Sequence, residues 1–485
     1  MPEESLKQKT AKSVAWSALN SGTTQLLNLV LGIFLARLLT PSDYGIVGVL
    51  SIFTMLAGNI QTCGFAHALI NLKVDRLEDY NAVFWFNVIT GAVLYGVLYC
   101  SAPLIARFFH QPCLVEVSRT LFLVFFISSF GIAHIGYMNK RLMNRETAIV
   151  CIIALTVSGA VGIMLAWMGK SYWSLVFQQL TYAVLITAGR YCYCPRLVSL
   201  HIDFSPLRSF FGFGMRIMLT NIANTLSNNV LTFIMGRLFP IHDVGNFSQA
   251  NKWSTLASTT VYSTVDQIVQ PVMVKAGGDV QRRKRVLRKL LRMTAFCAFP
   301  SMLGLALVSR EFILVTIGPK WLDAVMLLRI LCCAGAVIPI HHVYQNFMAS
   351  IGRSDIYLYT NIALIFTQIA AVLLASSHGI QTMVATYVVV MLSWTLVWHA
   401  MAHRVIRLSV KDLLSDLLPI VVVTVAMVCV TWAVTRGIDH VVLKLCVRVV
   451  VAAVFYVSVM WLTRNDILMD IIAFVKERRQ SAQSK

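Results

Sequence analysis

Residues 35–45 read LARLLTPSDYG, and residues 235–245 read MGRLFPIHDVG. The shared positions are spaced by 200: Arg37, Leu38, Asp43 and Gly45 return as Arg237, Leu238, Asp243 and Gly245, and Asn28 returns as Asn228. Each stretch ends one long apolar run and opens the next. Six predicted membrane spans separate the copies, and an even number leaves them pointing the same way. The pattern therefore predicts a parallel internal repeat, two similar lobes related by an axis along the membrane normal.

The composition excludes a water-soluble fold. Of 485 residues, 58% are hydrophobic and only 13% are charged, whereas soluble domains carry about 25% charged residues. The apolar residues form blocks of about 20, the length of helix that crosses a bilayer core of about 30 Å. Alternating segments of about 10 residues, typical of outer-membrane barrels, are not seen. We therefore expect an all-α integral membrane protein.

Fourteen apolar runs are predicted as transmembrane helices. They cover 13–36, 43–66, 82–105, 117–138, 147–168, 172–189, 207–235, 242–274, 288–308, 321–349, 356–375, 380–401, 413–434 and 442–462. The first is expected to be retained rather than cleaved as a signal peptide. The implied parts are an N-terminal tail (1–12), a first lobe (13–189), a linker (190–206), a second lobe (207–401), two additional spans (402–462) and a C-terminal tail (463–485).

The positive charges orient these spans. With both termini in the cytoplasm, the predicted cytoplasmic segments hold 28 of the 41 Lys and Arg residues, as the positive-inside rule requires. The formal net charge of +20 is accordingly attributed to topology and to anionic lipid headgroups. Nucleic acid is not an expected partner.

Polar and charged residues inside three of the spans predict a wet central cavity. Spans 13–36, 207–235 and 242–274 are rich in Asn, Gln, Ser and Thr, and polar groups at membrane depth need protein or water around them. A cation at the bilayer centre costs at least about 2.5 kcal/mol, so intramembrane cations are candidates for function. The candidate substrate-binding residues are Arg216, Lys252, Arg329, Arg37, Asn28, Asn221, Asn228 and Asp266.

Each candidate also has a structural interpretation. Lys252 could pair with a neighbouring carbonyl, and Arg37 could extend its side chain to the outer membrane surface. The same snorkelling interpretation is favoured for Arg119 and Arg448, near the outer ends of their spans. Three cations against the single acid Asp266 nevertheless predict a cavity suited to an anion.

The remaining motifs are interpreted as structural. Thr40, Pro41 and Asp43 fit the N-cap, N1 and N3 positions that open a helix. The cysteines are expected to be free and to act as small hydrophobic residues. For the pair Cys192 and Cys194 this interpretation is favoured over a metal site. No catalytic motif, nucleotide-binding loop, cofactor or metal site is predicted.

Five segments together resemble a known family. They are FLARLLTPSDYGIVGVLSIF (34–53), VGNFSQANKW (244–253), FPSMLGLAL (299–307), GPKW (318–321) and IGRSDI (351–356). In this order they resemble Wzx-type polysaccharide flippases, the colanic-acid exporter-like branch of the multidrug/oligosaccharidyl-lipid/polysaccharide superfamily. The resemblance implies two six-helix lobes around a cavity, two extra helices, and transfer of undecaprenyl-diphosphate-linked oligosaccharides across a bacterial inner membrane.

The resemblance also sets the expected partners and the alternatives. The partners are the lipid-linked oligosaccharide, membrane lipids and, as a candidate, a coupling proton or sodium ion; a monomer is expected. The first alternative is a multidrug antiporter of the same superfamily, which predicts twelve spans and deep carboxylates. The second is a membrane polysaccharide polymerase or ligase, which needs a large outer loop.

Overall fold

The structure is a computed structural model that describes residues 6–62, 76–194, 198–200, 202–205, 211–275 and 279–469. Within these ranges all regular secondary structure is helical, as predicted. The chain divides into two compact units, Met1–Gly245 and Asn246–Lys485. The predicted lobe boundaries stay a prediction.

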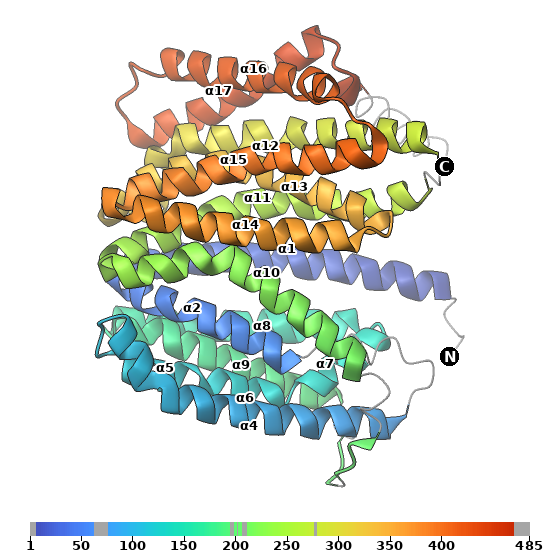
Figure 1. The fold of residues 1–485 in the computed structure, drawn as a ribbon. Helices are drawn as coiled ribbons and strands as arrows, with labels where there is room; N and C mark the ends of the chain where they lie inside the picture. The colour runs from blue at the N-terminus through green and yellow to red at the C-terminus, as the bar shows by residue number, and fades with distance from the viewer. Residues whose placement is uncertain are drawn as a thin grey trace. The chain divides into compact units, whose positions relative to one another are not determined.

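The first unit is a bundle of long helices (Figure 1). Its helices are α1 (Leu6–Leu38), α2 (Pro41–Thr62), α4 (Leu77–Phe108), α5 (Leu114–Leu121), α6 (Leu123–Ser129), α7 (Ile132–Lys140), α8 (Asn144–Trp167), α9 (Trp173–Tyr193), α10 (Phe211–Leu238) and the first turn of α11 (Ile241–Lys275). Helix α8 packs between α1 and α9, α2 packs on α10, and α4 supports α5, α6 and α7.

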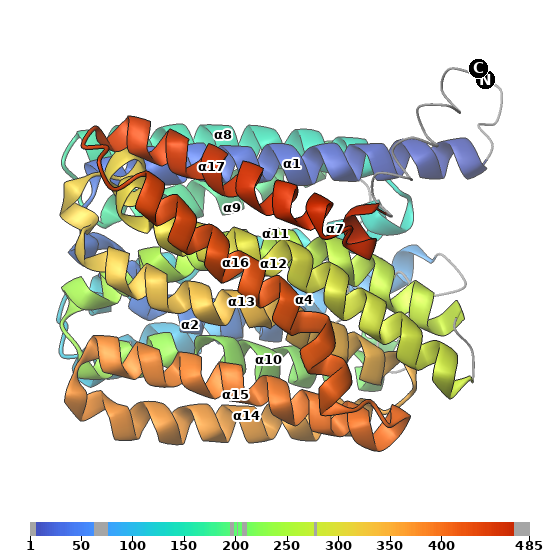
Figure 2. The ribbon, with the colours of Figure 1, turned by 90° about the horizontal axis from the view of Figure 1, so that it is seen from above.

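The second unit is built around α13. Its helices are the rest of α11, α12 (Val280–Thr316), the short 3₁₀ helix η2 (Pro319–Trp321), α13 (Asp323–Ser350), α14 (Ser354–Ala375), the 3₁₀ helix η3 (Ser376–His378), α15 (Ile380–Ile406), α16 (Val410–Val434) and α17 (Val441–Leu462). Helix α13 packs on α12, α14 and α15, with Trp321, Tyr344 and Trp398 fully buried. Figure 2 shows α16 and α17 lying across α12, which both contact.

Every predicted span coincides with helical structure over its described residues; residues 63–66 of the second span and 207–210 of the seventh lie outside them. The range 117–138 is not one continuous helix. It consists of α5, α6 and α7, with a bend of 44° before α7. Among the described residues, ten helices are long and apolar enough to cross a membrane, or eleven with the bent pair. Helices α9, α10 and α11 do not reach that hydropathy. The protein is thus a multi-pass membrane protein, while the count of fourteen crossings stays a prediction.

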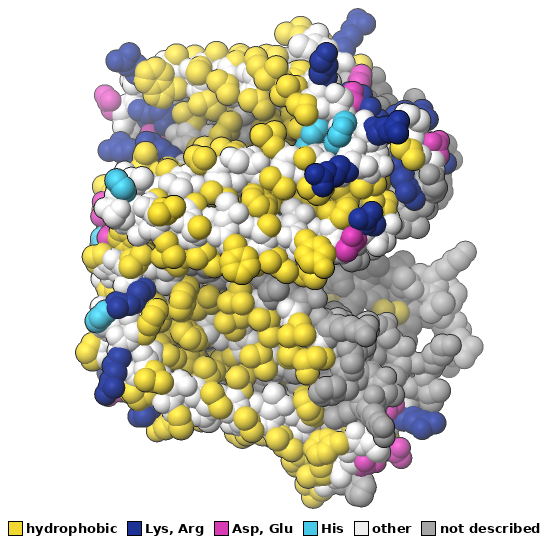
Figure 3. Space-filling model, in the orientation of Figure 1, with side chains coloured by type: hydrophobic (Ala, Val, Ile, Leu, Met, Phe, Trp, Pro, Cys, Tyr) yellow, Lys and Arg dark blue, Asp and Glu magenta, His cyan; other side chains and the backbone are white. Residues whose placement is uncertain are grey.

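The surfaces of both units suit a lipid environment. Large apolar side chains are exposed along the helices, among them Phe366 (68%), Leu374 (79%) and Val450 (61%). Figure 3 shows hydrophobic side chains along the helices and charged side chains mostly at helix ends. In water these exposed chains would lose the hydrophobic free energy that burial supplies, whereas lipid tails solvate them.

The start of α2 confirms the predicted capping series. The backbone N–H and the hydroxyl of Thr40 donate to Asp43 Oδ2 over 2.8 and 2.7 Å, and the Asp43 N–H donates back to the Thr40 hydroxyl. Ser171 also donates to Asp43 Oδ1. Asp43 therefore closes a capping box that fixes the direction in which the chain leaves α1.

Candidate functional site

Two of the predicted cations, Lys252 and Arg329, lie in the second unit on neighbouring helices. Both side chains are exposed. Arg329 of α13 donates through Nε to the Ser309 hydroxyl of α12 over 2.9 Å. One turn further along α12, Phe312 packs edge-on against Trp253, the residue after Lys252 (ring centroids 5.0 Å apart). These two contacts place Lys252 and Arg329 at similar heights along α12.

In the first unit, the structure gives the predicted Asn221 a partner that sequence reasoning missed. Asn59 of α2 donates through Nδ2 to the Thr225 hydroxyl over 2.5 Å and to the Asn221 carbonyl over 3.4 Å. Asn59 is thus bound to the polar face of α10. Its polarity within the apolar run 43–66 was the signal that could have identified it. Asn28 of α1 has an exposed side chain.

The repeated arginines at the ends of α1 and α10 differ in their surroundings. Arg237 hydrogen-bonds to His110 (Nη1 to Nδ1, 2.7 Å) and lies over the ring of Phe108. Its repeat partner Arg37 is exposed. Arg237, the arginine of the second copy, is therefore bound to the end of α4.

Three predicted residues have described backbones only. Arg216 and Asn228 belong to α10, and Asp266 belongs to α11. Their side chains lie outside the described part of the structure.

The repeat itself forms a close helix crossing inside the first unit. A Cβ on Gly45 would lie 2.0 Å from the Ile241 carbonyl oxygen, and a Cβ on Gly245 would lie 1.7 Å from that of Pro41. No side chain fits at such distances, so both positions require glycine. The two glycines of the repeat therefore lie in one and the same helix crossing.

The second unit contains two buried carboxylates that the sequence analysis did not find. Glu311 of α12 accepts from Arg448 of α17 over 2.8 Å, and both side chains are less than 10% exposed. Asp416 of α16 binds Arg288 of α12 through two contacts of 2.7 and 2.9 Å. Each of these two buried acids is therefore paired with an arginine.

The snorkelling interpretation of Arg448 is therefore wrong. Its guanidinium points into the unit, where it also donates to the Leu307 carbonyl and the Thr435 hydroxyl, each over 3.0 Å. Arg119, for which snorkelling was also favoured, lies over the ring of Tyr99 at 4.2 Å, a cation–π contact within the first unit.

Cys194 is buried, and two histidines of the second unit make hydrogen bonds within it. Cys194 follows α9, and burial raises the pKa of its thiol, which disfavours the thiolate that metals require. Among the described residues no three metal-ligating side chains cluster. His341 hydrogen-bonds to Thr395 over 2.9 Å, and His399 hydrogen-bonds to the Tyr344 hydroxyl over 3.2 Å.

Comparison with solved structures defines the class of fold. The inward closed conformation of the lipid II flippase MurJ superposes with a TM-score of 0.72, covering 92% of this chain and 98% of MurJ at 11% identity. An inward-facing multidrug resistance transporter of the MATE family superposes with a TM-score of 0.61, covering 80% of this chain and 96% of the transporter at 14% identity. The chain therefore has the same fold as these two membrane transporters.

Sequence comparison then gives the family. The chain belongs to the polysaccharide biosynthesis protein family, whose sequence profile matches residues 34–326. It is 23% identical to the succinoglycan biosynthesis transport protein ExoT of Rhizobium meliloti, over 97% of this chain and 96% of that protein. It is 23% identical to the lipopolysaccharide biosynthesis protein WzxC of Escherichia coli, over 76% of each chain. It is 22% identical to the teichuronic acid biosynthesis protein TuaB of Bacillus subtilis, over 90% of this chain and 91% of that protein. The family resemblance of the five segments is confirmed.

Proposed function

We propose that this protein is a flippase that moves undecaprenyl-diphosphate-linked oligosaccharide units across the bacterial inner membrane by alternating access. The observation that carries the proposal is the joint result of fold and family. A fold shared with the lipid II flippase over 92% of this chain occurs in a member of the polysaccharide biosynthesis protein family. A lipid-linked glycan is the substrate class that unites the two.

The charges of the second unit support an anionic substrate. Lys252 and Arg329 are exposed cations at similar heights along α12, and the buried acids Glu311 and Asp416 are already paired with Arg448 and Arg288. A diphosphate needs cations that are not already neutralised, because an ion pair within the protein competes with the ligand.

The proposal includes the orientation and the substrate contacts. Both termini lie in the cytoplasm, and Arg216, Lys252, Arg329, Arg37, Asn28, Asn221, Asn228 and Asp266 are the proposed contacts. Alternating access exposes them first to the cytoplasmic side and then to the outer side.

The test is polysaccharide export in a deletion strain complemented with variants of this protein. Lys252→Ala and Arg329→Ala are each expected to lower export at least about tenfold, the loss expected when a charge-assisted contact disappears, with unchanged abundance in the membrane. Arg310→Ala is the matched control, since Arg310 is an exposed cation of α12 that the proposal does not use. Full export by both variants would remove the cationic cavity from the proposal.

The fold similarity to a multidrug transporter makes an antiporter the second candidate. It predicts that everted vesicles take up a cationic dye when a proton or sodium gradient is imposed, and that wild-type protein does not restore polysaccharide export. Restored export without dye uptake supports the flippase.

A further inference from the structure

Helix α7 starts at a bend of 44° after α6, inside the first unit. Helix α7 begins after Gly131, whose position as N-cap offers no side-chain hydrogen bond. The first N–H groups of a helix lack intrahelical partners, so those of α7 can donate to a ligand.

Two side chains of α9 converge on this helix start. Arg190 Nη1 lies 2.9 Å, and Thr187 Oγ1 lies 3.3 Å, from the point where a Cβ on Gly131 would stand. Thr187 is only 8% exposed, and its hydroxyl has no hydrogen-bond partner among the described residues. A buried hydroxyl without a partner is unfavourable, so a ligand oxygen bound at this point would satisfy it.

Arg190 has no counter-charge in the part of the chain that the structure describes. Among the described residues, no ion pair or hydrogen bond involves its side chain. The titratable groups that interact with it are Cys151, Tyr182 and His134, none of which carries a negative charge at neutral pH. By contrast, the buried Arg448 of the second unit faces Glu311. An anion bound at this point would supply the counter-charge that the guanidinium lacks among the described residues.

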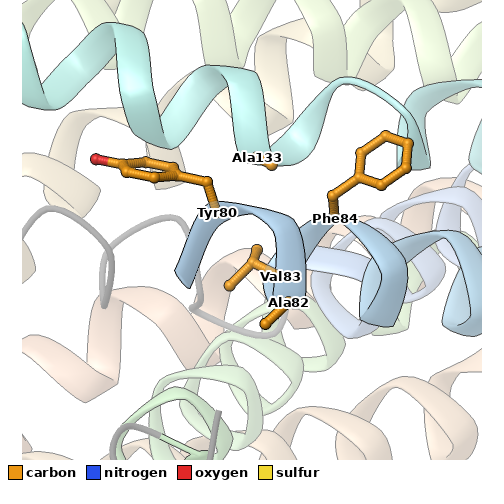
Figure 4. Close-up of a cluster of buried hydrophobic side chains, with 5 residues drawn as sticks. All are labelled: Tyr80, Ala82, Val83, Phe84 and Ala133. Atoms are coloured by element: carbon orange, nitrogen blue, oxygen red, sulfur yellow. The ribbon is translucent and has the colours of Figure 1, made fainter. Parts of the chain in front are cut away.

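The site is held in place by packing on α4. Figure 4 shows Ala133 of α7 against the α4 residues Tyr80 and Phe84, part of a buried cluster. The ring of His134 lies between Phe84 and Tyr191, with centroids 6.4 and 4.2 Å away. The start of α7 and the end of α9 are thus fixed relative to each other, which pre-organises a binding site.

We propose that Arg190 and Thr187, together with the N-terminus of α7, bind the phosphate of a lipid headgroup. Guanidinium groups and helix N-termini are the two protein groups best suited to phosphate. The side chain of Arg190 is partly exposed, so a headgroup can reach it. Arg190 stands near the end of α9, on the predicted cytoplasmic side, where a lipid-linked substrate would enter. This assignment of the lipid rests on the proposed function.

The experiment measures ligand binding by native mass spectrometry of the purified full-length protein in detergent. The ligands are a polyprenyl diphosphate, phosphatidylglycerol and inorganic phosphate. For polyprenyl diphosphate we expect Arg190→Gln to raise the Kd at least about tenfold and Thr187→Val to raise it about two- to tenfold, the losses typical of a charge-assisted and a neutral hydrogen bond. Arg141→Gln is the control, because Arg141 stacks on Tyr137 at the other end of α7, and its Kd is expected to stay unchanged.

The outcomes separate the sources of phosphate. Weaker binding of polyprenyl diphosphate supports the substrate headgroup. Weaker binding of phosphatidylglycerol alone supports the same site with a bilayer lipid as its occupant. Unchanged binding of all three ligands by Arg190→Gln, or an effect on inorganic phosphate only, overturns the lipid site.

A second variant keeps the test decisive if Arg190→Gln does not fold. Gly131→Ala keeps the charge but places a methyl group 2.9 Å from Arg190 Nη1, so it displaces the guanidinium and should weaken binding to a similar extent. The binding assay involves no transport. If the wild-type protein failed to restore export, the proposed function would be wrong, but the binding site could still be correct. If export were normal and both variants bound the ligands as the wild type does, only the proposed site would be wrong.

Discussion

Gly45 and Gly245 face each other where α2 crosses the first turn of α11. The Cβ position of Gly245 is 1.7 Å from the Pro41 carbonyl oxygen and 3.1 Å from the Gly45 nitrogen, and that of Gly45 is 2.0 Å from the Ile241 carbonyl oxygen. Ile241 is the counterpart of Pro41 after the shift of 200 residues. Each copy of the repeat therefore packs its glycine against the first carbonyl of the other copy's helix.

Substituting either glycine is expected to disrupt the crossing. Gly245→Ala puts a methyl group into the backbone of Pro41, and backbone cannot move aside as a flexible side chain can. We expect a large loss of folded protein in the membrane and a melting temperature lowered by several degrees, measured by fluorescence-detected gel filtration after heating. Gly304→Ala is the control, because a Cβ on Gly304 meets nothing within 4 Å and alanine favours a helix. Equal stability of Gly245→Ala and wild type would contradict the crossing.

The ion pairs between α12 and α16 predict a second effect on stability. Asp416 is 5% exposed and accepts two bonds from Arg288, whose side chain is 31% exposed. Asp416→Asn removes the charge and is expected to lower the free energy of unfolding by about 1.5–3 kcal/mol, the range for hydrogen bonds to charged groups. Thermal unfolding in detergent measures it.

The control for that prediction is an exposed pair on α14. Arg353 and Asp355 are both about half exposed and lie 3.0 Å apart, and such pairs contribute little because water screens them. Asp355→Asn is expected to leave the melting temperature unchanged. If both variants behaved alike, the burial of Asp416 would have no energetic consequence.

The buried pair of Glu311 and Arg448 predicts non-additive substitutions. Removing one partner leaves an uncompensated buried charge, so Glu311→Gln or Arg448→Met alone is expected to cost about 3–5 kcal/mol. The double variant Glu311→Leu with Arg448→Met removes both charges and is expected to be more stable than either single variant. A double-mutant cycle of thermal unfolding checks this, and an additive loss would contradict it.

These residues also show which features the sequence made predictable. The capping box of Thr40 and Asp43 was found because its partners are three residues apart and its chemistry is local. The polarity of α10 and α11 was found because it depends on composition alone. Glu311 and Arg448 are 137 residues apart, and nothing in the pattern of either segment indicates the other. Their pairing depends on how α17 packs against α12.

Two further residues, Arg190 and Glu311, were not predicted as site residues because their helices are longer than the apolar runs. Arg190 was assigned to a linker because the apolar run appeared to end at Gly189, yet α9 continues to Tyr193. Because α9 extends beyond its apolar run, Arg190 lies inside the unit rather than in a loop. Its neighbours on α6 and α7 are distant in sequence, so only the folded structure identifies them. Glu311 was assigned to a loop for the same reason, because α12 continues to Thr316.

The count of crossings predicts on which side of the membrane two loops lie. Lys170, before α9, and Asp439, after α16, are both exposed and are separated by the eight helices α9 to α16. If all eight cross, including the polar helices α9, α10 and α11, both loops lie outside. In a background without native cysteines, Lys170→Cys and Asp439→Cys should react with a membrane-impermeant maleimide on intact cells. Lys411→Cys, at the start of α16, should react only after permeabilisation. Reaction of Lys170→Cys and Asp439→Cys from opposite sides would mean that an odd number of these helices cross, and would remove one span from the predicted fourteen.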